Sequence, residues 1–414
     1  MRKEIEEQLA RIQTADILVG IPSFNNARTI GHVVRAVQAG LAKYFPDYKA
    51  VLVNSDGGST DTTSSIVQNT VLENVEAILF QHRVPPLFKV TAPYGGIPGK
   101  GSAFRMIFEI ATALNVKACA VVDSDLRSIT PEWIELLLKP VLSDRFDYVA
   151  PLYHRHKYDG TITNSIIYPL TRALYGKRVR QPIGGDFGFS GNLAKFYLTK
   201  DVWDTDIARY GIDIWMTTEA IANGFRIAQA FLGAKLHDPK DPGSDLSAML
   251  YQVVGSAFGL MEEYSKLWKT VQGSETIPTY GFQYAVGLEK VTVQYEKMLA
   301  IFREGVKSLG EIWIDILGQG DYGQLQQIAS LPDKEFVFPA ALWARIIYDY
   351  AIAHHTKKIT REHLLKSLTP LYLGKTASFV REAEQFTHEE SEEAIERLCI
   401  LFEDNKELLI NAWK

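Results

Sequence analysis

The chain has 414 residues, of which 46% are hydrophobic and 22% are charged, and its formal net charge is −5. This length accommodates two domains with a core each, and the composition is typical of a globular protein. A weakly acidic chain lacks the basic surface of nucleic-acid-binding proteins, so nucleic acid is excluded as an expected partner.

The start of the chain and its longest apolar run carry no export or membrane signal. Met1–Glu7 is charged and lacks the apolar region of a signal peptide. The longest apolar candidate, residues 107–122, is interrupted by Glu109, Asn115 and Lys117, and falls short of the about 18 apolar residues that span a membrane. We therefore expect a cytoplasmic protein without an integral membrane segment.

The chain has two cysteines, Cys119 and Cys399, which lie far apart in sequence. Both occur in apolar, periodic segments, which is typical of reduced core residues in an intracellular protein. Neither a disulfide nor a cysteine metal site is expected.

Strands and helices alternate from about residue 16 to residue 240. The predicted strands cover residues 17–22, 51–54, 75–81 and 118–122. Pro22 is expected to end the first of them. Helices are predicted from about Thr29 to Leu41 and, after a glycine-rich loop at 94–101, through Ala113. This alternation predicts an α/β fold with a mostly parallel sheet and right-handed crossovers.

From about residue 241 glycine becomes sparse and apolar residues recur at helical spacing. The clearest stripes are Leu288, Val291, Tyr295, Met298 and Phe302, then residues 340–353, and then residues 389–401 behind a predicted capping box of Thr387 and Glu390. We expect this half to be entirely helical. The predicted division is a domain of residues 1–240 followed by a helical domain of residues 241–414.

Two carboxylates, Asp123 and Asp125, follow the predicted central strand at 118–122. Open α/β sheets bind their ligands at this carboxyl edge. Carboxylates this close repel each other unless a cation lies between them, and Mg²⁺ or Mn²⁺ carrying a nucleotide diphosphate would serve. The alternative is a solvated turn before a helix that Asp125 or Ser128 caps.

The loops after the first two strands are suited to a nucleotide. Pro22, Phe24 and Asn26 lie in a loop whose amides and short polar side chains suit a base and ribose, although a simple strand-to-helix connection would look the same. Asp56 ends the second strand and is placed to accept hydrogen bonds from a base or a sugar hydroxyl. For the residues that follow Asp56, turn chemistry alone is the competing interpretation.

Two glycine-rich segments are suited to phosphate and sugar. Lys100, between two glycines at a helix start, suits an anion, although a solvated lysine in a turn is the alternative. Gly184 and Gly185 lie in residues 181–188, a segment rich in glycine and proline. Such a segment lets the main chain approach a ligand closely, which predicts that it forms a wall of a sugar pocket.

Four motifs occur in this order: Pro98-Gly99-Lys100-Gly101, Asp123-Ser124-Asp125 with Pro131-Glu132-Trp133, Gln181-Pro182-Ile183-Gly184-Gly185, and Tyr210-Gly211-Ile212-Asp213. Together they resemble the GT-A glycosyltransferases, and most closely the retaining mannosylglycerate synthase and glucosyl-3-phosphoglycerate synthase group. The resemblance spans nearly the whole chain, because residues 336–355 are similar to the C-terminal domain of that group. It implies a GT-A, Rossmann-like first domain and, by analogy, a homo-oligomer.

The resemblance implies a role for each of several positions. Asp125 and His237 would ligate the divalent metal, Mg²⁺ or Mn²⁺, and Asp123 would touch the nucleotide or reach the ion through water. Lys100 would contact the donor near its phosphates, and Asp56 would contact the nucleotide. In the family a basic residue and a tyrosine follow the histidine, whereas Asp238-Pro239-Lys240 follow it here. The resemblance therefore does not identify which nucleotide the donor carries.

The acceptor positions follow from the same resemblance. Arg155 and Thr163 would hold the carboxylate and hydroxyl of a small acidic acceptor, and an arginine fork suits a carboxylate. Asp213 would lie close to the transferred sugar and the acceptor. Asp213 and Lys100 are therefore the candidate catalytic residues.

These positions lead to one hypothesis and three alternatives. The hypothesis is transfer of glucose or mannose, with retention, from a nucleotide diphosphate sugar to glycerate, 3-phosphoglycerate or a similar hydroxy acid. A transferase acting on a polymer or lipid phosphate would share the donor site. A sugar-nucleotide pyrophosphorylase should carry a basic glycine-rich loop after the first strand, which residues 22–27 lack. A non-catalytic sugar-nucleotide-binding protein is the third alternative, and an activity assay distinguishes it.

Overall fold

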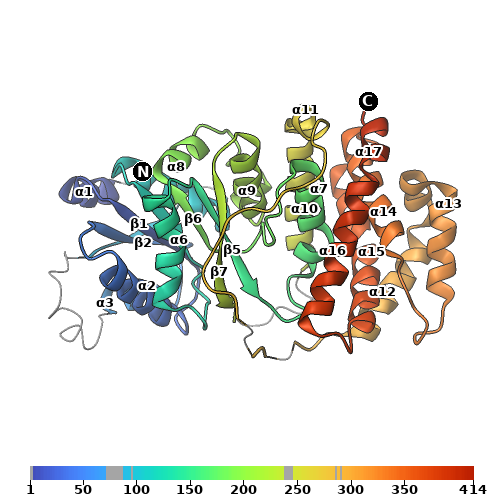
Figure 1. The fold of residues 1–414 in the computed structure, drawn as a ribbon, viewed down its shortest axis with the longest axis horizontal. Helices are drawn as coiled ribbons and strands as arrows, with labels where there is room; N and C mark the ends of the chain where they lie inside the picture. The colour runs from blue at the N-terminus through green and yellow to red at the C-terminus, as the bar shows by residue number, and fades with distance from the viewer. Residues whose placement is uncertain (1–2, 71–86, 95–96, 237–245, 285–286, 290) are drawn as a thin grey trace. The chain divides into compact units, whose positions relative to one another are not determined.

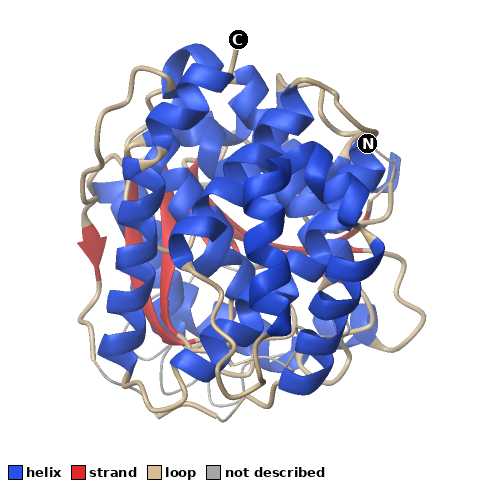
Figure 2. Cartoon of the chain, turned by 90° about the vertical axis from the view of Figure 1, so that its right-hand side faces the viewer, coloured by secondary structure: helices blue, strands red, loops and turns tan. Residues whose placement is uncertain are grey.

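A computed structural model describes residues 3–70, 87–94, 97–236, 246–284, 287–289 and 291–414 (Figures 1 and 2). The chain forms two compact units. The first consists of Met1–His154, Val179–Asp238 and Ile277–Gly287, and the second of Arg155–Arg178, Pro239–Thr276 and Leu288–Lys414. The predicted boundary between residues 240 and 241 lies outside the described residues, and the division at that point stays a prediction.

The first unit is built on an eight-stranded sheet of order β3-β2-β1-β4-β6-β5-β7-β8 (Figure 1). Its strands are β1 (Ile17–Ser23), β2 (Ala50–Asp56), β3 (Phe88–Pro93), β4 (Ala118–Val121), β5 (Tyr148–His154), β6 (Phe187–Ser190), β7 (Ile227–Ala234) and β8 (Thr279–Tyr280). Neighbouring strands are parallel except where β6 pairs with β4 and β5. The predicted α/β fold with a mostly parallel sheet is confirmed.

Helices cover both faces of this sheet. They are α1 (Lys3–Ile12), α2 (Ile30–Tyr44), α3 (Thr63–Asn69), α5 (Lys100–Ala113), α6 (Pro131–Ser143), α8 (Gly191–Leu198) and α9 (Ile212–Ala222), with a 3₁₀ turn η2 (Asp206–Ala208). Alternate β1 residues such as Val19 join Val33 of α2 and Ile134 of α6 in one core. Gly20, on the opposite face, lies against Ile107 of α5. The period of two along β1 thus separates two helical layers.

The first strand continues one residue beyond the predicted end at Pro22. Pro22 pairs with Ser55 of β2, whereas the pairing of β1 with β4 stops at Gly20 and Val121. At Pro22 the strand therefore has a neighbour on one side only, where a residue without an amide hydrogen is tolerated.

Other differences concern short elements. The predicted strand at 75–81 lies outside the described residues, and β3 was not predicted. The N-cap of α6 is Thr130, so neither Asp125 nor Ser128 caps that helix. The short strand β8, at Thr279–Tyr280, shows that residues 241–414 are not entirely helical, because it pairs with β7.

The second unit consists of helices (Figure 2). These are η1 (Thr163–Ile167), α7 (Tyr168–Tyr175), α10 (Ser247–Glu263), α11 (Ser265–Trp268), α12 (Tyr295–Ser308), α13 (Gly310–Ser330), α14 (Ala340–His355), α15 (Arg361–Glu382), α16 (His388–Asp404) and α17 (Lys406–Ala412). The capping box of Thr387 and Glu390 is present at the start of α16, as predicted. Leu288 and Val291 lie before α12, so the predicted stripe is helical only from Tyr295.

Among the described residues, no helix combines the length and the apolar character needed to cross a bilayer. Cys119 and Cys399 are both buried, as predicted, and both are thiols rather than parts of a disulfide.

Candidate active site

Three strands bring charged side chains to one edge of the sheet. Asp123 follows β4 and Lys235 follows β7. Asp186 precedes β6, and because β6 is antiparallel its first residue, Phe187, lies opposite Val121 at the end of β4. Lys235 Nζ lies 2.7 Å from Asp123 Oδ2 and 2.7 Å from Asp186 Oδ2. One ammonium therefore joins two carboxylates that would otherwise repel each other.

Asp186 anchors this arrangement from within the core. Its side chain is fully buried, and burial raises the pKa of its carboxyl group. The carboxylate nevertheless accepts hydrogen bonds from the Tyr153 hydroxyl, from Lys235 and, at 2.7 Å, from the Asp123 amide. Because these three partners all donate, the ionised form of Asp186 matches its surroundings.

Lys100 connects the same cluster to α9. Its Nζ lies 3.0 Å from Asp123 Oδ1 and 3.3 Å from Asp213 Oδ1, and it donates to the Gly185 carbonyl at 3.3 Å. Asp213 Oδ2 accepts a hydrogen bond from Lys100 at 3.4 Å, whereas the buried Oδ1 accepts none from the described residues. The structure thus brings together Lys100, Asp123 and Asp213, all three of which the sequence had singled out.

The charges in the cluster shift one another's pKa values. Burial favours neutral Asp123, but the attraction of Lys100 and Lys235 outweighs it and holds the pKa of Asp123 below its ordinary value. Burial likewise opposes the charge of Lys100, yet Asp123 and Asp213 raise its pKa above the ordinary value. For Asp213 burial dominates and raises the pKa, against the opposing effect of Lys100. Of the two carboxylates that contact Lys100, Asp213 is therefore more readily protonated than Asp123.

Gly185 makes the close approach of these groups geometrically feasible. Its φ is +94°, and a methyl group there would lie 2.3 Å from Asp123 Oδ2 and 2.8 Å from Lys235 Nζ. The preceding carbonyl, of Gly184, accepts a hydrogen bond from Lys235 at 2.8 Å. The glycines predicted as a wall of a sugar pocket thus hold both lysines through their backbone oxygens.

Asp125 is the available carboxylate next to this cluster. It is half-buried and makes no ion pair or hydrogen bond with another described side chain. Leu236 runs alongside the same loop, because its carbonyl accepts from the Arg127 amide at 2.9 Å and its amide donates to Ser128 Oγ at 2.9 Å. His237, the other predicted metal ligand, lies outside the described residues.

The charge of the site fits a divalent cation. The cluster sets three aspartates against two lysines, and Asp125 adds a further carboxylate two residues from Asp123. Hard oxygen ligands with a surplus of negative charge suit Mg²⁺ or Mn²⁺. In the part of the chain that the structure describes, no group of three or more potential metal-ligating side chains comes together, so any fuller ligand set would need further ligands such as His237 or the donor itself.

The loop after β1 is fastened to the Asp123–Asp125 loop. Asn26 Oδ1 accepts from Ser124 Oγ at 2.8 Å and from the Phe24 amide at 2.9 Å, and Thr29 Oγ1 donates to the Ser124 carbonyl at 2.8 Å. The amide oxygen of Asn26 thus holds two loops together. The ring of Phe24 is 58% exposed and is the part of this loop open to a ligand.

Asp56 is mostly occupied by its own turn. Its carboxylate accepts from Ser59 Oγ at 2.6 Å, from the Ser59 amide at 3.1 Å, from Ser64 Oγ at 3.1 Å and from Ser23 Oγ at 3.3 Å. Since an ionised carboxylate offers about four acceptor positions, little capacity remains for a base or ribose. Contact of Asp56 with the nucleotide stays a prediction.

The glycines around Lys100 serve close packing. A methyl group on Gly101 would lie 1.8 Å from the Ile207 carbonyl, and the Gly101 amide already donates to the Arg209 carbonyl at 3.2 Å. The amide of Gly99 donates to the Tyr94 hydroxyl at 3.2 Å. These two amides at the start of α5 therefore already have hydrogen-bond acceptors. The positive charge at this end of the helix comes from the ammonium of Lys100.

The predicted acceptor residues belong to the second unit and lie close together there. A methyl group on Gly160 would lie 3.5 Å from Arg155 Nη1 and 3.9 Å from Thr163 Oγ1. Arg155 Nη1 also lies 3.4 Å from Asp159 Oδ2, and its side chain is 17% exposed. The structure thus groups Arg155 and Thr163 around one turn.

This turn is held rigidly within the second unit. Thr163 opens the π-helical turn η1, a rare element that often marks functional sites. Thr161 Oγ1 is hydrogen-bonded to the Tyr372 hydroxyl, and the Tyr158 hydroxyl donates to the Val380 carbonyl at 3.0 Å, both on α15. The backbone at residues 158–163 is therefore fixed by α15.

Sequence reasoning missed Lys235, Asp186 and Tyr153. Lys235 ends the apolar run of β7, so its position at the carboxyl edge was visible in principle. Asp186 had no such signal, because its place beside Asp123 depends on the reversed direction of β6. Tyr153 looked like an ordinary strand residue.

Replacement of Lys235 by methionine tests this buried network. Lys235→Met would leave Asp123 and Asp186 without their shared cation, and we expect the free energy of unfolding to fall by about 3–5 kcal/mol. Chemical unfolding followed by circular dichroism measures it. Lys43→Met is the matched control, because its pair with Glu132, at 3.2 Å, is exposed to solvent and should contribute little to the free energy of unfolding. Equal effects of the two substitutions would contradict a structural role for Lys235.

Comparison with known proteins finds similarity to glycosyltransferases. Residues 18–203 match the family model described as Glycosyl transferase family 2. The chain is 25% identical over 278 residues to the glucosyl-3-phosphoglycerate synthase of Petrotoga mobilis, which covers 63% of this chain and 78% of that protein.

Two solved structures of glucosyl-3-phosphoglycerate synthase from Mycobacterium tuberculosis are also similar. The one with Mn²⁺, UDP and glucosyl-3-phosphoglycerate is 23% identical, with a TM-score of 0.44, and covers 69% of this chain and 92% of that chain. The one with Mn²⁺, UDP-glucose and phosphoglyceric acid is 23% identical, with a TM-score of 0.43, and the match covers 62% of this chain and 84% of that chain. From its match to the family model at residues 18–203 and its similarity to the Petrotoga protein, the chain resembles the GT-A glycosyltransferases and, among them, glucosyl-3-phosphoglycerate synthase.

Proposed function

We propose that the protein transfers a glucosyl group from a nucleotide diphosphate sugar to 3-phosphoglycerate or a closely related small hydroxy acid, with retention at the anomeric carbon. The name of the Petrotoga relative supports glucose and 3-phosphoglycerate. Mannose as the sugar and glycerate as the acceptor are the nearest variants of the same reaction.

The observation that carries this proposal is the buried pair of Lys100 and Asp213. The carboxylate of Asp213 lies in the first turn of α9 and keeps one oxygen without a hydrogen-bond donor among the described residues. Although Oδ1 lies 3.3 Å from the Lys100 ammonium, it forms no hydrogen bond there, and such an oxygen can accept one from a sugar hydroxyl. We assign Asp213 to the transferred sugar and Lys100 to its orientation.

The donor's diphosphate belongs next to Asp125 in this proposal. Asp125, with His237, would hold a divalent metal, which would supply positive charge to the departing diphosphate. Asp123, already neutralised by Lys100 and Lys235, would contact the nucleotide. Phe24 offers an exposed ring on which a base can stack.

Arg155 and Thr163 are the proposed acceptor contacts. Arg155 carries a planar fork that can bind a carboxylate or phosphate through two parallel hydrogen bonds. Asp159, 3.4 Å from its Nη1, holds that fork in place. The Thr163 hydroxyl is suited to the hydroxyl of the acceptor, since it both donates and accepts.

Retention follows if the acceptor hydroxyl attacks from the face that the diphosphate leaves. The bond from the anomeric carbon to the phosphate oxygen breaks, the bond to the acceptor oxygen forms, and the hydroxyl proton passes to the departing diphosphate. No protein nucleophile takes part in this route. A covalent route would need a carboxylate at the anomeric carbon, and Asp213 is the candidate for it.

A substrate matrix tests the proposed function. UDP-glucose, GDP-glucose and GDP-mannose are each combined with 3-phosphoglycerate, D-glycerate and glycerol 3-phosphate, with Mg²⁺ or Mn²⁺ present. We expect a hexosyl product by mass spectrometry with the highest rate for a glucose donor and 3-phosphoglycerate, and an axial anomeric bond by NMR. Absence of any product, with nucleotide sugars still bound, would favour a non-catalytic binding protein.

Substitution of Asp125 tests the metal site. Asp125→Asn keeps the size of the side chain but removes its charge, so we expect the Mn²⁺ concentration for half-maximal activity to rise by at least about tenfold. Isothermal titration of Mn²⁺ in the absence of acceptor gives a second readout. The control is Asp204→Asn, an exposed aspartate before η2, which should change neither. Full metal-dependent turnover by Asp125→Asn would refute the assignment.

Substitution of Arg155 tests the acceptor site. Arg155→Ala removes a charge-assisted contact, so we expect the KM for 3-phosphoglycerate to rise about tenfold or more while the Kd for the nucleotide sugar stays unchanged. Arg35→Ala, on the exposed face of α2, is the control and should alter neither value. A weaker donor affinity with an unchanged acceptor KM would show that Arg155 serves the donor instead.

A further inference from the structure

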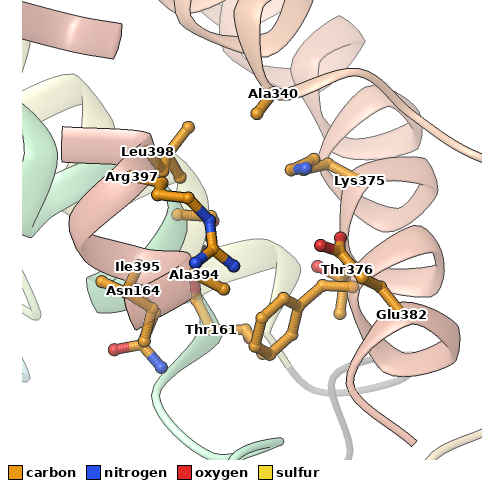
Figure 3. Close-up of a pocket in the computed structure, with 12 residues that line it drawn as sticks. Thr161, Asn164, Ala340, Lys375, Thr376, Glu382, Ala394, Ile395, Arg397 and Leu398 are labelled. Atoms are coloured by element: carbon orange, nitrogen blue, oxygen red, sulfur yellow. Dashed lines mark hydrogen bonds between the residues drawn. The ribbon is translucent and has the colours of Figure 1, made fainter. Parts of the chain in front are cut away.

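The helical unit contains a cavity that the proposed transfer reaction does not use. Its volume is about 100 Å³, several times the roughly 10–15 Å³ that one water molecule needs on this measure. It lies between α15 and α16, with Thr161 and Asn164 at one side (Figure 3), and Ser165 also lines it. The greater part of its surface is apolar and includes Phe379 and Leu398. The cavity has room for a molecule of a few heavy atoms with an apolar body.

A buried lysine extends into this cavity. Lys375, on α15, is only 6% exposed, and Figure 3 shows its ammonium directed into the open space. In the described part of the chain its one hydrogen bond is to the Phe338 carbonyl, at 3.2 Å. An ammonium has three donors, so two of them stay available, in a lining whose surface is mostly apolar. A buried charge of this kind requires a partner.

Two further charged side chains line the same cavity. Arg397, on α16, points its guanidinium toward the space from the side opposite Lys375 (Figure 3). Its ion pair with Glu393, at 3.7 Å, is long and exposed, so the guanidinium can turn toward a ligand. Glu382 is the only acidic residue in the lining. Two positive charges against one negative charge match a monoanion.

We propose that this cavity is a binding site for a small organic carboxylate, held by Lys375 and Arg397 with its short apolar body against Phe379 and Leu398. A phosphate fits less well, because it carries more charge than the lining compensates and has no apolar part. The site is distinct from the acceptor position at Arg155, which is not among the residues that line it.

The position of the site suggests what a bound carboxylate would do. Thr161 and Ser165 flank Thr163, the residue proposed for the acceptor, and Asn164 also lines the cavity. A ligand packed against these residues stabilises the start of the π-helical turn η1. The carboxylate would therefore act as an effector of acceptor binding.

The protonation of Lys375 provides a signature of binding. Burial lowers the pKa of Lys375 to about 8, with Glu382 opposing the shift. A bound carboxylate favours the charged lysine and so raises this pKa. Near pH 8, where Lys375 is only partly charged, binding takes up a fraction of a proton, whereas at pH 6, where Lys375 is already charged, it takes up none. The other charged groups in the lining are Glu382 and Arg397.

The test measures binding of propionate to the full chain, without any nucleotide sugar. Isothermal titration at pH 8 in two buffers of different ionisation enthalpy gives both the affinity and the protons taken up. We expect Lys375→Met to weaken propionate binding about tenfold or more and to abolish the proton uptake. Ala394→Phe, which fills the cavity without changing its charge, should abolish binding.

The matched control is Lys406→Met. Lys406 is also a buried lysine whose pKa burial lowers to about 8, but it donates to the Val271 carbonyl and does not line the cavity. This variant should bind propionate as the unaltered chain does. Thermal unfolding of each variant shows whether it is folded. If Lys375→Met does not fold, the binding of propionate to Ala394→Phe decides the question.

Four results would overturn the proposal. They are no binding of propionate at millimolar concentration, equal binding of neutral propionamide, tighter binding of inorganic phosphate than of propionate, and unchanged binding in the folded Lys375→Met or Ala394→Phe variant. Because the titration contains neither donor nor acceptor, its outcome is independent of whether the protein transfers a sugar.

Discussion

The buried contact of Lys235 with Asp123 and Asp186 is the constraint on which the first unit depends. Three elements meet at this lysine: the end of β4, the start of β6 and the end of β7. Removing each carboxylate from water is unfavourable in free energy, and the shared ammonium and the hydrogen bonds around it offset that cost. The sheet edge therefore has one well-defined arrangement of its loops.

The remaining parts of the candidate site are organised around that contact. Asp123, held by Lys235, positions Ser124, which in turn fastens the loop after β1 through Asn26. On the other side of Asp123, Lys100 carries the electrostatic connection to Asp213. Ion pairs in such a low-dielectric setting are stronger than at the surface, so the geometry of Asp213 is fixed before a sugar arrives.

Much of the fold could be predicted because it follows from local patterns. The apolar periodicity of α2 and the capping box before α16 each appear in the sequence and in the structure. The positions of Lys100, Asp123 and Asp213 were predicted through motif order, and the structure brings these three side chains together. The local predictions that were wrong have identifiable physical reasons. Pro22, for example, stays in its strand because β4 has already ended beside it.

The remainder of the site depends on long-range topology. Asp186 contacts Asp123 because one strand is reversed, and no spacing rule reveals such a reversal. Lys375 looked like one of many helix lysines, since its burial is determined by the packing of α15 against α12 and α14. The roles of Gly99 and Gly101 also changed, from an open anion site to close packing against η2, because the partner of that contact lies a hundred residues away in sequence.

The dependence of Asp186 on Lys235 has an evolutionary consequence. A single mutation of either residue leaves an uncompensated charge in the core, so each single mutant is less fit than both the starting chain and a chain in which both positions have become neutral. The two positions should therefore change together or not at all, and relatives of this chain should display either the complete ion network or an apolar replacement of it, with intermediate combinations rare.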